Sequence, residues 1–160
     1  MTIQLGDKIP GATLTTMTAD GPGPVSTQEF FGGRKVVLFS VPGAFTPTCS
    51  AKHLPGFVEH ADEILAKGVD AIACVSVNDV FVMNAWGKSA GVEDKVVMLA
   101  DGNAEFAKAL GLEMDASGFG MGTRSKRFSM IVEDGTVTQL NIEEPGAFQV
   151  SSAEHALTQL

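Results

Sequence analysis

Two continuous apolar runs dominate the hydrophobic pattern of the chain, residues 35–41 (KVVLFSV) and residues 69–77 (VDAIACVSV). Both are rich in β-branched residues and lack the alternation of a strand with one solvated face, so they predict strands covered on both sides. Between them, apolar residues recur at helical spacing over residues 53–67, and Gly68 is a suitable helix terminator. This order predicts a crossover helix between two central parallel strands.

The alternation of helix and strand continues downstream. Residues 79–89 and 103–111 have helical patterns on either side of the apolar run 96–101. Either Asn103 or Asp101 is expected to cap the second of these helices, because both side chains accept hydrogen bonds from free backbone N–H groups.

The C-terminal part of the sequence has a different pattern. Residues 127–134 and 136–143 are β-prone runs on either side of Gly135, which predicts an antiparallel hairpin. The final ten residues begin with Ser151 and Glu154 at capping-box spacing and predict a terminal helix.

Three parallel βα units, a hairpin and a terminal helix predict an α/β protein of thioredoxin-like fold, with a central mixed sheet flanked by helices. Residues 19–24 and 115–125 are rich in glycine and are expected to be loops, the first ahead of a short helix at 26–31. We expect one domain over residues 1–160, because no repeat or linker divides the sequence. Ligand chemistry is then expected at the carboxyl ends of the parallel strands.

Charge and composition exclude several classes of partner. The net charge is −8, from 19 acidic and 11 basic side chains, so nucleic acid is not an expected partner. No apolar run approaches the roughly 18 residues of a membrane span, and the first residues lack the features of a secretion signal, so we expect a cytoplasmic location and no membrane partner. Cys49 and Cys74 are too few for a disulfide framework or an all-thiolate zinc site.

Cys49 lies on a rigid, polar stretch, PGAFTPTC, that follows the first central strand. A free thiol has a pKa of about 8.5 and needs help to form the nucleophilic thiolate at neutral pH. The N-terminus of the following helix offers unpaired N–H groups and the positive end of a dipole. Pro42 and Pro47 stiffen the loop, and the Thr46 hydroxyl can be placed beside the sulfur.

This stretch resembles the peroxiredoxin active-site signature Pro-x-x-x-Thr-x-x-Cys, at Pro42, Thr46 and Cys49. The longer VPGAFTPTCSAKHLPGF is similar to type V peroxiredoxins, called type II in plants, and CVSVNDVFVMNAW and KRFSM add matches in order. The resemblance implies a thiol peroxidase in which Cys49 attacks hydrogen peroxide or an alkyl hydroperoxide and becomes a sulfenic acid. It implies neither a metal nor an organic cofactor.

The resemblance also assigns Arg127, whose permanent charge would favour the thiolate and orient the peroxide oxygens. Arg124, in the same basic run, is expected to support the site or bind an anionic reductant. Some type V members carry a C-terminal resolving cysteine, where this chain has serines. The implied reductant is therefore an outside thiol, either glutathione with glutaredoxin or thioredoxin, or else an unusual pairing with Cys74. A homodimer formed near the active-site loops is also implied.

Further candidates near the motif have structural alternatives. Gly43 is assigned to substrate binding, and Phe45 and Phe119 are candidates for an apolar wall that admits organic hydroperoxides, although core or dimer contacts would explain both rings equally well. His53 is expected to shape the pocket. Its spacing of four residues from Cys49 would also suit a metal, but two ligands lack a third.

Two other classes of function compete with the peroxidase. A redox-sensing or chaperone-like binding module would be oxidised at Cys49 without turnover, and a hydrolase would need His53 as the base for that cysteine. A disulfide reductase is disfavoured because the chain has no Cys-x-x-Cys pair. Cys74 lies inside the second apolar run and is expected to be a buried core side chain.

Overall fold

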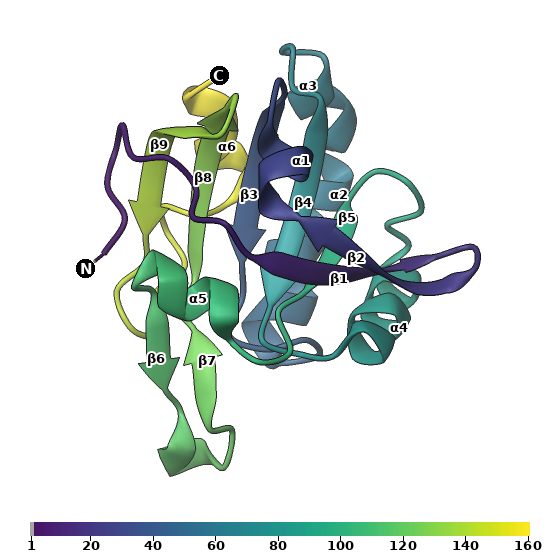
Figure 1. Cartoon of the computed structure of the whole chain (residues 1–160), viewed down its shortest axis with the longest axis vertical. Coiled ribbons are helices and arrows are strands. Elements are labelled where there is room, and N and C mark those ends of the chain that lie inside the picture. The colour runs from purple at the N-terminus through teal and green to yellow at the C-terminus, as the bar shows by residue number, and fades with distance from the viewer. Residues whose placement is uncertain (1) are drawn as a thin grey trace.

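The computed structural model describes residues 2–160 and confirms the predicted mixed sheet (Figure 1). Its seven strands have the order β2-β1-β5-β4-β3-β8-β9. At the centre, β3 (Lys35–Ser40), β4 (Ala71–Ser76) and β5 (Val97–Ala100) run parallel, and β8 (Phe128–Glu133) pairs antiparallel with β3. The carboxyl ends of β3 and β4 therefore share one edge of the sheet with the start of β8.

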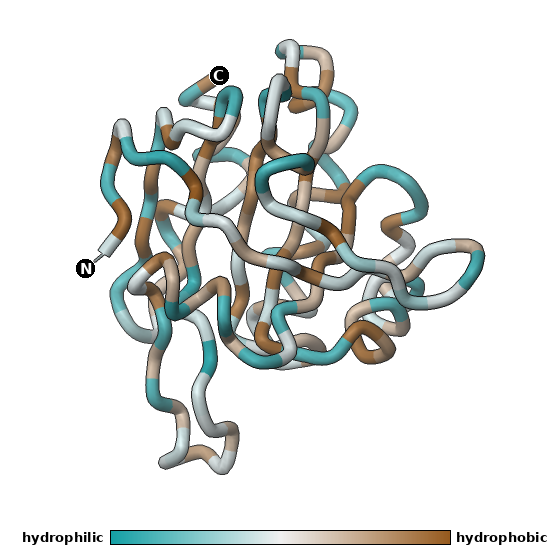
Figure 2. The backbone as a smooth tube through the Cα atoms, in the orientation of Figure 1, coloured by the Kyte–Doolittle hydropathy of each residue, from teal (hydrophilic) through white to brown (hydrophobic). Residues whose placement is uncertain are grey.

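Helices cover both faces of this sheet, as the unbroken apolar runs predict. One face packs against α2 (Leu54–Glu59), α3 (Ala61–Leu65), α4 (Val80–Ala90) and α6 (Ala153–Thr158), and the other against α1 (Thr27–Phe31) and α5 (Glu105–Leu110). The central strands are accordingly hydrophobic along their length, while polar residues gather in the connections (Figure 2). Among residues 2–160, no helix combines the length and the apolar character that crossing a bilayer requires.

The C-terminal hairpin forms where the sequence predicts it. Strands β8 and β9 (Thr136–Ile142) are joined by Asp134 and Gly135, which have φ of 48° and 77°. Positive φ at both central residues is the geometry of a type I′ turn, which matches the twist of the two strands. Because Ser40 lies opposite Phe128, this hairpin brings the residue before β8 to the end of β3.

The N-terminal hairpin corrects the expected loop at residues 19–24. Strand β1 (Thr13–Thr18) pairs with β2 (Gly21–Ser26), so only two residues form the turn. Strand β2 has the sequence GPGPVS, and strand propensity does not predict it because glycine and proline are both disfavoured in strands. Proline is tolerated there because β2 is the outer strand of the sheet and pairs on one side only.

The glycine-rich segment 115–125 is also more ordered than the expected loop. Strands β6 (Glu113–Asp115) and β7 (Thr123–Ser125) form a small separate sheet, and the one-turn helix η2 (Ser117–Phe119) lies between them. Strands of three residues are too short to show a period in the sequence, which explains the missed elements.

The predicted crossover helix forms with Cys49 in its first turn, as expected, but it is not uniform. It starts as a π-helical turn, η1 (Cys49–His53), in which the Leu54 N–H donates to the Cys49 carbonyl. Pro55 cannot donate to the carbonyl four residues back and would clash with it in a regular α-helix, which favours the wider turn. A second irregularity at His60, with ψ of 8°, separates α2 from α3.

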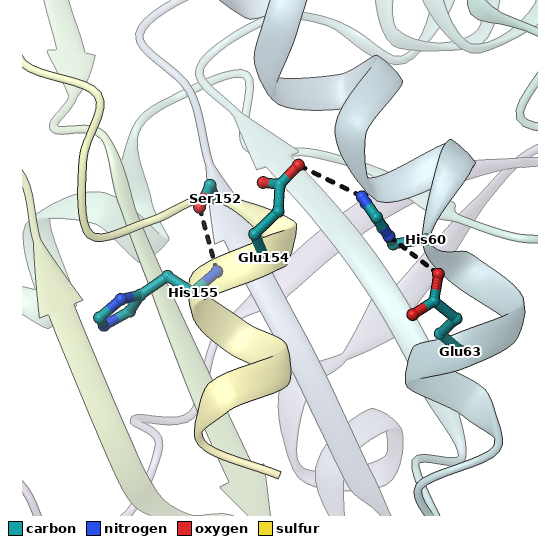
Figure 3. Close-up of polar contacts among 5 residues, drawn as sticks. All are labelled: His60, Glu63, Ser152, Glu154 and His155. Carbon is teal, nitrogen blue, oxygen red and sulfur yellow. Dashed lines mark hydrogen bonds and ion pairs between the residues drawn. The ribbon is translucent and has the colours of Figure 1, made fainter.

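Two helix caps were predicted from the sequence, with different outcomes. The Asp101 carboxylate accepts hydrogen bonds from the Phe106 and Ala107 N–H groups at the start of α5, so Asp101 rather than Asn103 holds this turn. The cap of α6 is Ser152, whose Oγ accepts from the His155 N–H, and not Ser151 (Figure 3). The Ser151 hydroxyl is engaged elsewhere.

His60 links the α2–α3 corner to α6 (Figure 3). Its Nδ1 lies 3.1 Å from Glu63 Oε1 and its Nε2 lies 3.2 Å from Glu154 Oε1. The hydrogen bond to Glu63, with the charge of Glu154 in support, raises the pKa of His60. The pair with Glu154 helps to hold α6 against α3.

Candidate active site

The loop after β3 is fixed by hydrogen bonds at both ends. The Ala44 N–H donates to Asn78 Oδ1 at 3.0 Å, which ties the loop to the end of β4. The Thr46 carbonyl accepts from the Ser50 N–H at 2.9 Å, which joins the loop to the start of the helix. Phe45, between these two anchors, has a φ of 63°, a conformation rarely adopted by a residue with a side chain. The loop is thus a defined structure.

Gly43 is a position of close approach. A Cβ atom there would lie 3.1 Å from Thr46 Cγ2, 3.2 Å from Met121 Cε and 3.4 Å from Arg124 Nη1. Any side chain at residue 43 would have to displace these neighbours, two of which come from the distant β6–β7 region. The half-buried Pro42 immediately precedes this contact.

Cys49 is fully buried and begins η1, and the structure brings Arg127 to it. Arg127 Nη2 donates to Cys49 Sγ at 2.9 Å, although the two residues are 78 positions apart in the sequence. The guanidinium therefore presents a permanently charged donor to the sulfur. Among the described residues the ion pairs are those of His60, so within residues 2–160 Arg127 has no carboxylate partner to offset its charge.

His53 lies behind Arg127. Its Nδ1 is 2.7 Å from Arg127 Nη1 and its Nε2 is 2.8 Å from the Ser151 carbonyl, so the ring accepts from the arginine and donates to the carbonyl. Burial, together with the charge of Arg127, lowers the pKa of His53 to about 3. Because both ring nitrogens are engaged, neither is available to bind a metal. To act as a base, Nδ1 would first have to lose the hydrogen bond that it accepts from Arg127.

The metal interpretation of the Cys49 and His53 spacing gains no support from their surroundings. Across residues 2–160, no group of three or more His, Cys, Asp or Glu side chains is arranged to hold a metal ion.

Thr46 and Arg124 lie close to the site but contact backbone groups. The Thr46 hydroxyl donates to the Gly43 carbonyl at 2.7 Å, which leaves its oxygen as an acceptor. Arg124 donates to the carbonyls of Met121 at 2.9 Å and Val77 at 3.0 Å. Arg124 therefore joins the β6–β7 sheet to the end of β4, which is a supporting position.

The two aromatic candidates are not brought together. Phe45 is 53% exposed, with its ring centroid 6.4 Å from that of Trp86. Phe119 is 86% exposed in η2, too open in this chain to form one wall of an enclosed pocket. Their roles toward substrate stay predictions.

Cys74 is a buried side chain of β4, as the sequence predicts. Burial raises the pKa of its thiol, and the nearby Cys49 adds to this effect. Both cysteines are free. Cys74 is therefore a protonated core thiol in the reduced protein.

Glu143 and Ser151 belong to the surroundings of the site, and reading the sequence did not find them. The buried Glu143 carboxylate accepts hydrogen bonds from the segment 149–151, whose last carbonyl holds His53. A glutamate at the end of a β-prone run looks like any solvated acid. Its structural role becomes visible only in the folded protein, through the hydrogen bonds that its carboxylate accepts from residues 149–151.

A buried cysteine paired with an arginine, at the carboxyl end of a central parallel strand of an α/β sandwich, is an arrangement suited to a thiol-based redox enzyme. Comparison with known proteins identifies which one: residues 4–157 match the Redoxin family, and the chain belongs to it. The fold is thioredoxin-like, with a mixed central sheet flanked by helices, as predicted.

The relatives are peroxiredoxins over their whole matched length. The chain is 58% identical to chloroplastic peroxiredoxin-2E-2 of Oryza sativa subsp. japonica, over 99% of this chain and 73% of that one. It is 48% identical to peroxiredoxin-2B of Arabidopsis thaliana, over 99% and 98% of the two chains. Reduced Prx3 of Vibrio vulnificus, solved in complex with hydrogen peroxide, is 55% identical and superposes with a TM-score of 0.96 over 99% of both chains. The protein is a thiol-dependent peroxidase.

Proposed function

We propose that Cys49 is the peroxidatic nucleophile and that Arg127 activates it. The observation that carries the proposal is the 2.9 Å contact between Arg127 Nη2 and Cys49 Sγ, made without a competing carboxylate among residues 2–160. The thiolate attacks one oxygen of the peroxide, and the O–O bond breaks. The leaving oxygen takes a proton and departs as water or an alcohol, and Cys49 becomes a sulfenic acid.

The substrate class is hydrogen peroxide together with alkyl hydroperoxides. The complex of the Vibrio vulnificus relative with hydrogen peroxide supports the first of these. The exposed rings of Phe45, in the loop after β3, and Phe119, in η2, are the proposed apolar contacts for organic hydroperoxides. The sulfenic acid is then reduced by an external thiol, through a type V mechanism that uses no second cysteine of the chain.

The reductant must reach a sulfur that is buried in the reduced protein. A bulky thiol can do so only after the first turn at Cys49 opens locally. Glutathione with glutaredoxin and thioredoxin are both thiol donors of suitable chemistry. A peroxidase assay coupled to NADPH oxidation, run separately with each system, tests the proposal: sustained peroxide-dependent turnover with either supports it, and oxidation of Cys49 without turnover would favour a redox sensor.

Thr46→Val is expected to slow peroxide reduction by about 2 to 4 kcal/mol of transition-state stabilisation, roughly 30- to 1,000-fold in rate. The Thr46 hydroxyl hydrogen is donated to the Gly43 carbonyl, so its oxygen is left as an acceptor, which in the proposed mechanism binds the peroxide O–H. Stopped-flow measurement of the second-order rate constant checks this. Thr46→Ser keeps the hydroxyl and is the matched control; a loss below about threefold in the valine variant would show that the hydroxyl is not used.

Cys74→Ser is expected to retain most of the activity with an external thiol. The Cys74 thiol is buried in β4, so pairing it with Cys49 would require the first turns of the helix to unfold. Mass spectrometry after one equivalent of peroxide, without reductant, should detect a sulfenic acid trapped by dimedone. An intramolecular disulfide as the main product would contradict the prediction.

We also propose that the protein forms a homodimer near the active-site loops and acts in the cytoplasm. The half-exposed ring of Phe45 supports the first part, because it lies at the loop and is only partly covered within the chain. Light scattering at tens of micromolar should give twice the chain mass, and a monomeric mass would contradict it. The location rests on the sequence, and cell fractionation decides between the cytoplasm and an organelle such as the one that the rice relative's name gives.

A further inference from the structure

The Glu143 carboxylate organises the segment that precedes α6. Its Oε2 accepts hydrogen bonds from the N–H groups of Gln149, Val150 and Ser151, each at 2.8 Å, and from the Ser151 hydroxyl at 2.7 Å. Glu143 is only 7% exposed, although it is charged. Three successive backbone donors converge on one oxygen, so the path of this segment is set by the carboxylate.

Segment 149–151 also positions His53, the side chain that contacts Arg127. The Ser151 carbonyl accepts from His53 Nε2 at 2.8 Å, and His53 Nδ1 accepts from Arg127 Nη1 at 2.7 Å. The other guanidinium nitrogen, Nη2, then donates to Cys49 Sγ. The contacts therefore form a continuous path from Glu143 through the backbone, the imidazole and the guanidinium to the sulfur.

Two further contacts connect the surroundings of Glu143 with His53 and Arg127. The Phe148 ring, one residue before the segment, lies 4.8 Å from the His53 ring and 5.7 Å from the Arg127 guanidinium carbon, measured to the ring centroids. The Glu143 N–H also donates to the Arg127 carbonyl at 3.0 Å. Glu143 thus fixes the Arg127 backbone directly and the end of its side chain through His53.

We propose that Glu143 is a positioning residue for the peroxidatic site: by shaping segment 149–151, it places the carbonyl that orients His53, and His53 aims Arg127 at Cys49. This inference rests on the proposed role of Cys49. Glu143 touches neither the sulfur nor the peroxide, and its effect passes through the geometry of the arginine.

The arrangement has a physical reason. A carboxylate bound directly to Arg127 would hold the guanidinium but would also offset the positive charge that favours the thiolate. Neutral imidazole holds the guanidinium without offsetting it, and burial beside Arg127 keeps the pKa of His53 at about 3. The Glu143 carboxylate instead binds backbone N–H groups of residues 149–151 and fixes the position of that segment. The Ser151 peptide and the His53 ring separate it from the Arg127 guanidinium.

Glu143 itself is built to stay ionised. Burial alone would raise its pKa, but the hydrogen bonds from Ser151, Gln149 and Val150 outweigh burial and leave the pKa below its usual value. An ionised oxygen accepts several donors more strongly than a neutral one does. The segment therefore keeps its shape at neutral pH.

The first test compares Glu143→Ala with Glu143→Gln. Glutamine can place its amide oxygen where Oε2 lies, so it keeps an acceptor for the segment, whereas alanine removes it. We expect the alanine variant to lose about 10- to 100-fold in the second-order rate with hydrogen peroxide, as misplaced catalytic groups do, and the glutamine variant to lose less than about threefold. The thiolate fraction of Cys49 at pH 7, read from absorbance at 240 nm, should fall in the alanine variant alone.

Glu144→Ala is the matched control, because it removes the same charge from the neighbouring, exposed position. It should leave both readouts unchanged. A Glu143→Ala variant that is folded by circular dichroism but has the wild-type rate and thiolate fraction would overturn the proposal. Equal losses in the glutamine and alanine variants would also overturn it, because an acceptor oxygen retained at residue 143 would then make no difference to the site.

A second pair keeps the proposal testable if Glu143→Ala does not fold. His53→Gln and His53→Glu have nearly the same shape and differ in charge. We expect glutamine to preserve more thiolate than glutamate, because only the glutamate offsets Arg127; equal thiolate fractions would contradict the inference. Failure of the proposed function is seen separately, since it would appear as peroxide turnover in Cys49→Ser.

Discussion

Cys49→Ser is expected to leave a folded protein that consumes no peroxide, a loss on the order of 10⁴-fold or more in rate. The serine hydroxyl fills nearly the same buried volume beside Arg127, so the packing of η1 against the sheet should survive. A hydroxyl is not ionised at neutral pH, even next to a guanidinium, and it cannot form a stable oxidised intermediate like a sulfenic acid. The reaction is lost while the fold remains.

Loss of hydrogen peroxide over time, followed with an excess of reductant, measures this effect, and thermal unfolding shows whether the variant is folded. Cys74→Ser is the matched control, since it makes the same chemical change in the same core. Turnover by a folded Cys49→Ser variant would place the nucleophile elsewhere. Loss of activity in both serine variants would indicate that Cys74 takes part in the cycle.

The second large effect concerns stability in acid. The free energy of unfolding should fall by about 2 kcal/mol between about pH 7 and pH 5, and by about 4 kcal/mol between about pH 7 and pH 3, through His53 alone. Burial and the charge of Arg127 lower the pKa of His53 from 6.5 to about 3. In this window the unfolded chain binds a proton that the folded protein excludes, so the stability that His53 contributes is complete above 6.5 and is lost as the pH falls.

Urea unfolding at several pH values between about 5 and 7 measures the slope, in a range where carboxylates remain ionised. His53→Gln removes the titrating ring and should flatten the curve by that amount. His60 acts with the opposite sign: its pKa is raised, so its contribution is complete below 6.5 and is lost only at higher pH. An unchanged acid slope in His53→Gln would show that the ring is not held neutral.

The central sheet could be predicted because its strands leave an unambiguous pattern. Residues 35–41 and 69–77 are apolar on both faces, and the Asp134–Gly135 pair marks the hairpin turn. Strand β2 could not be predicted, because its prolines oppose strand propensity and only its place at the sheet edge permits them. The π-helical turn at Cys49 depends on how the helix accommodates Pro55, and residue helix propensities do not predict that.

The site divides in a similar way. Cys49 and Arg127 follow from a motif and its family, and the structure brings the two together. The expectation that the Thr46 hydroxyl lies beside the sulfur stays a prediction; the hydrogen bond that this hydroxyl donates to the Gly43 carbonyl is a contact that the motif does not reveal. The parts played by Glu143 and Ser151 depend on contacts across about a hundred residues, such as that between His53 and Ser151, and these arise only from the folded topology.

The pairing of β3 with β8 has a consequence for the protein while it is being made. Cys49 emerges from the ribosome well before Arg127, and Arg127 before Ser151, because synthesis runs from the N-terminus. Long-range strand pairing of this kind completes late in folding. Until it does, Cys49 has no guanidinium beside it, so under the proposed mechanism we expect the nascent chain to react slowly with peroxide and to reach its full rate only when the last strand and helix are in place.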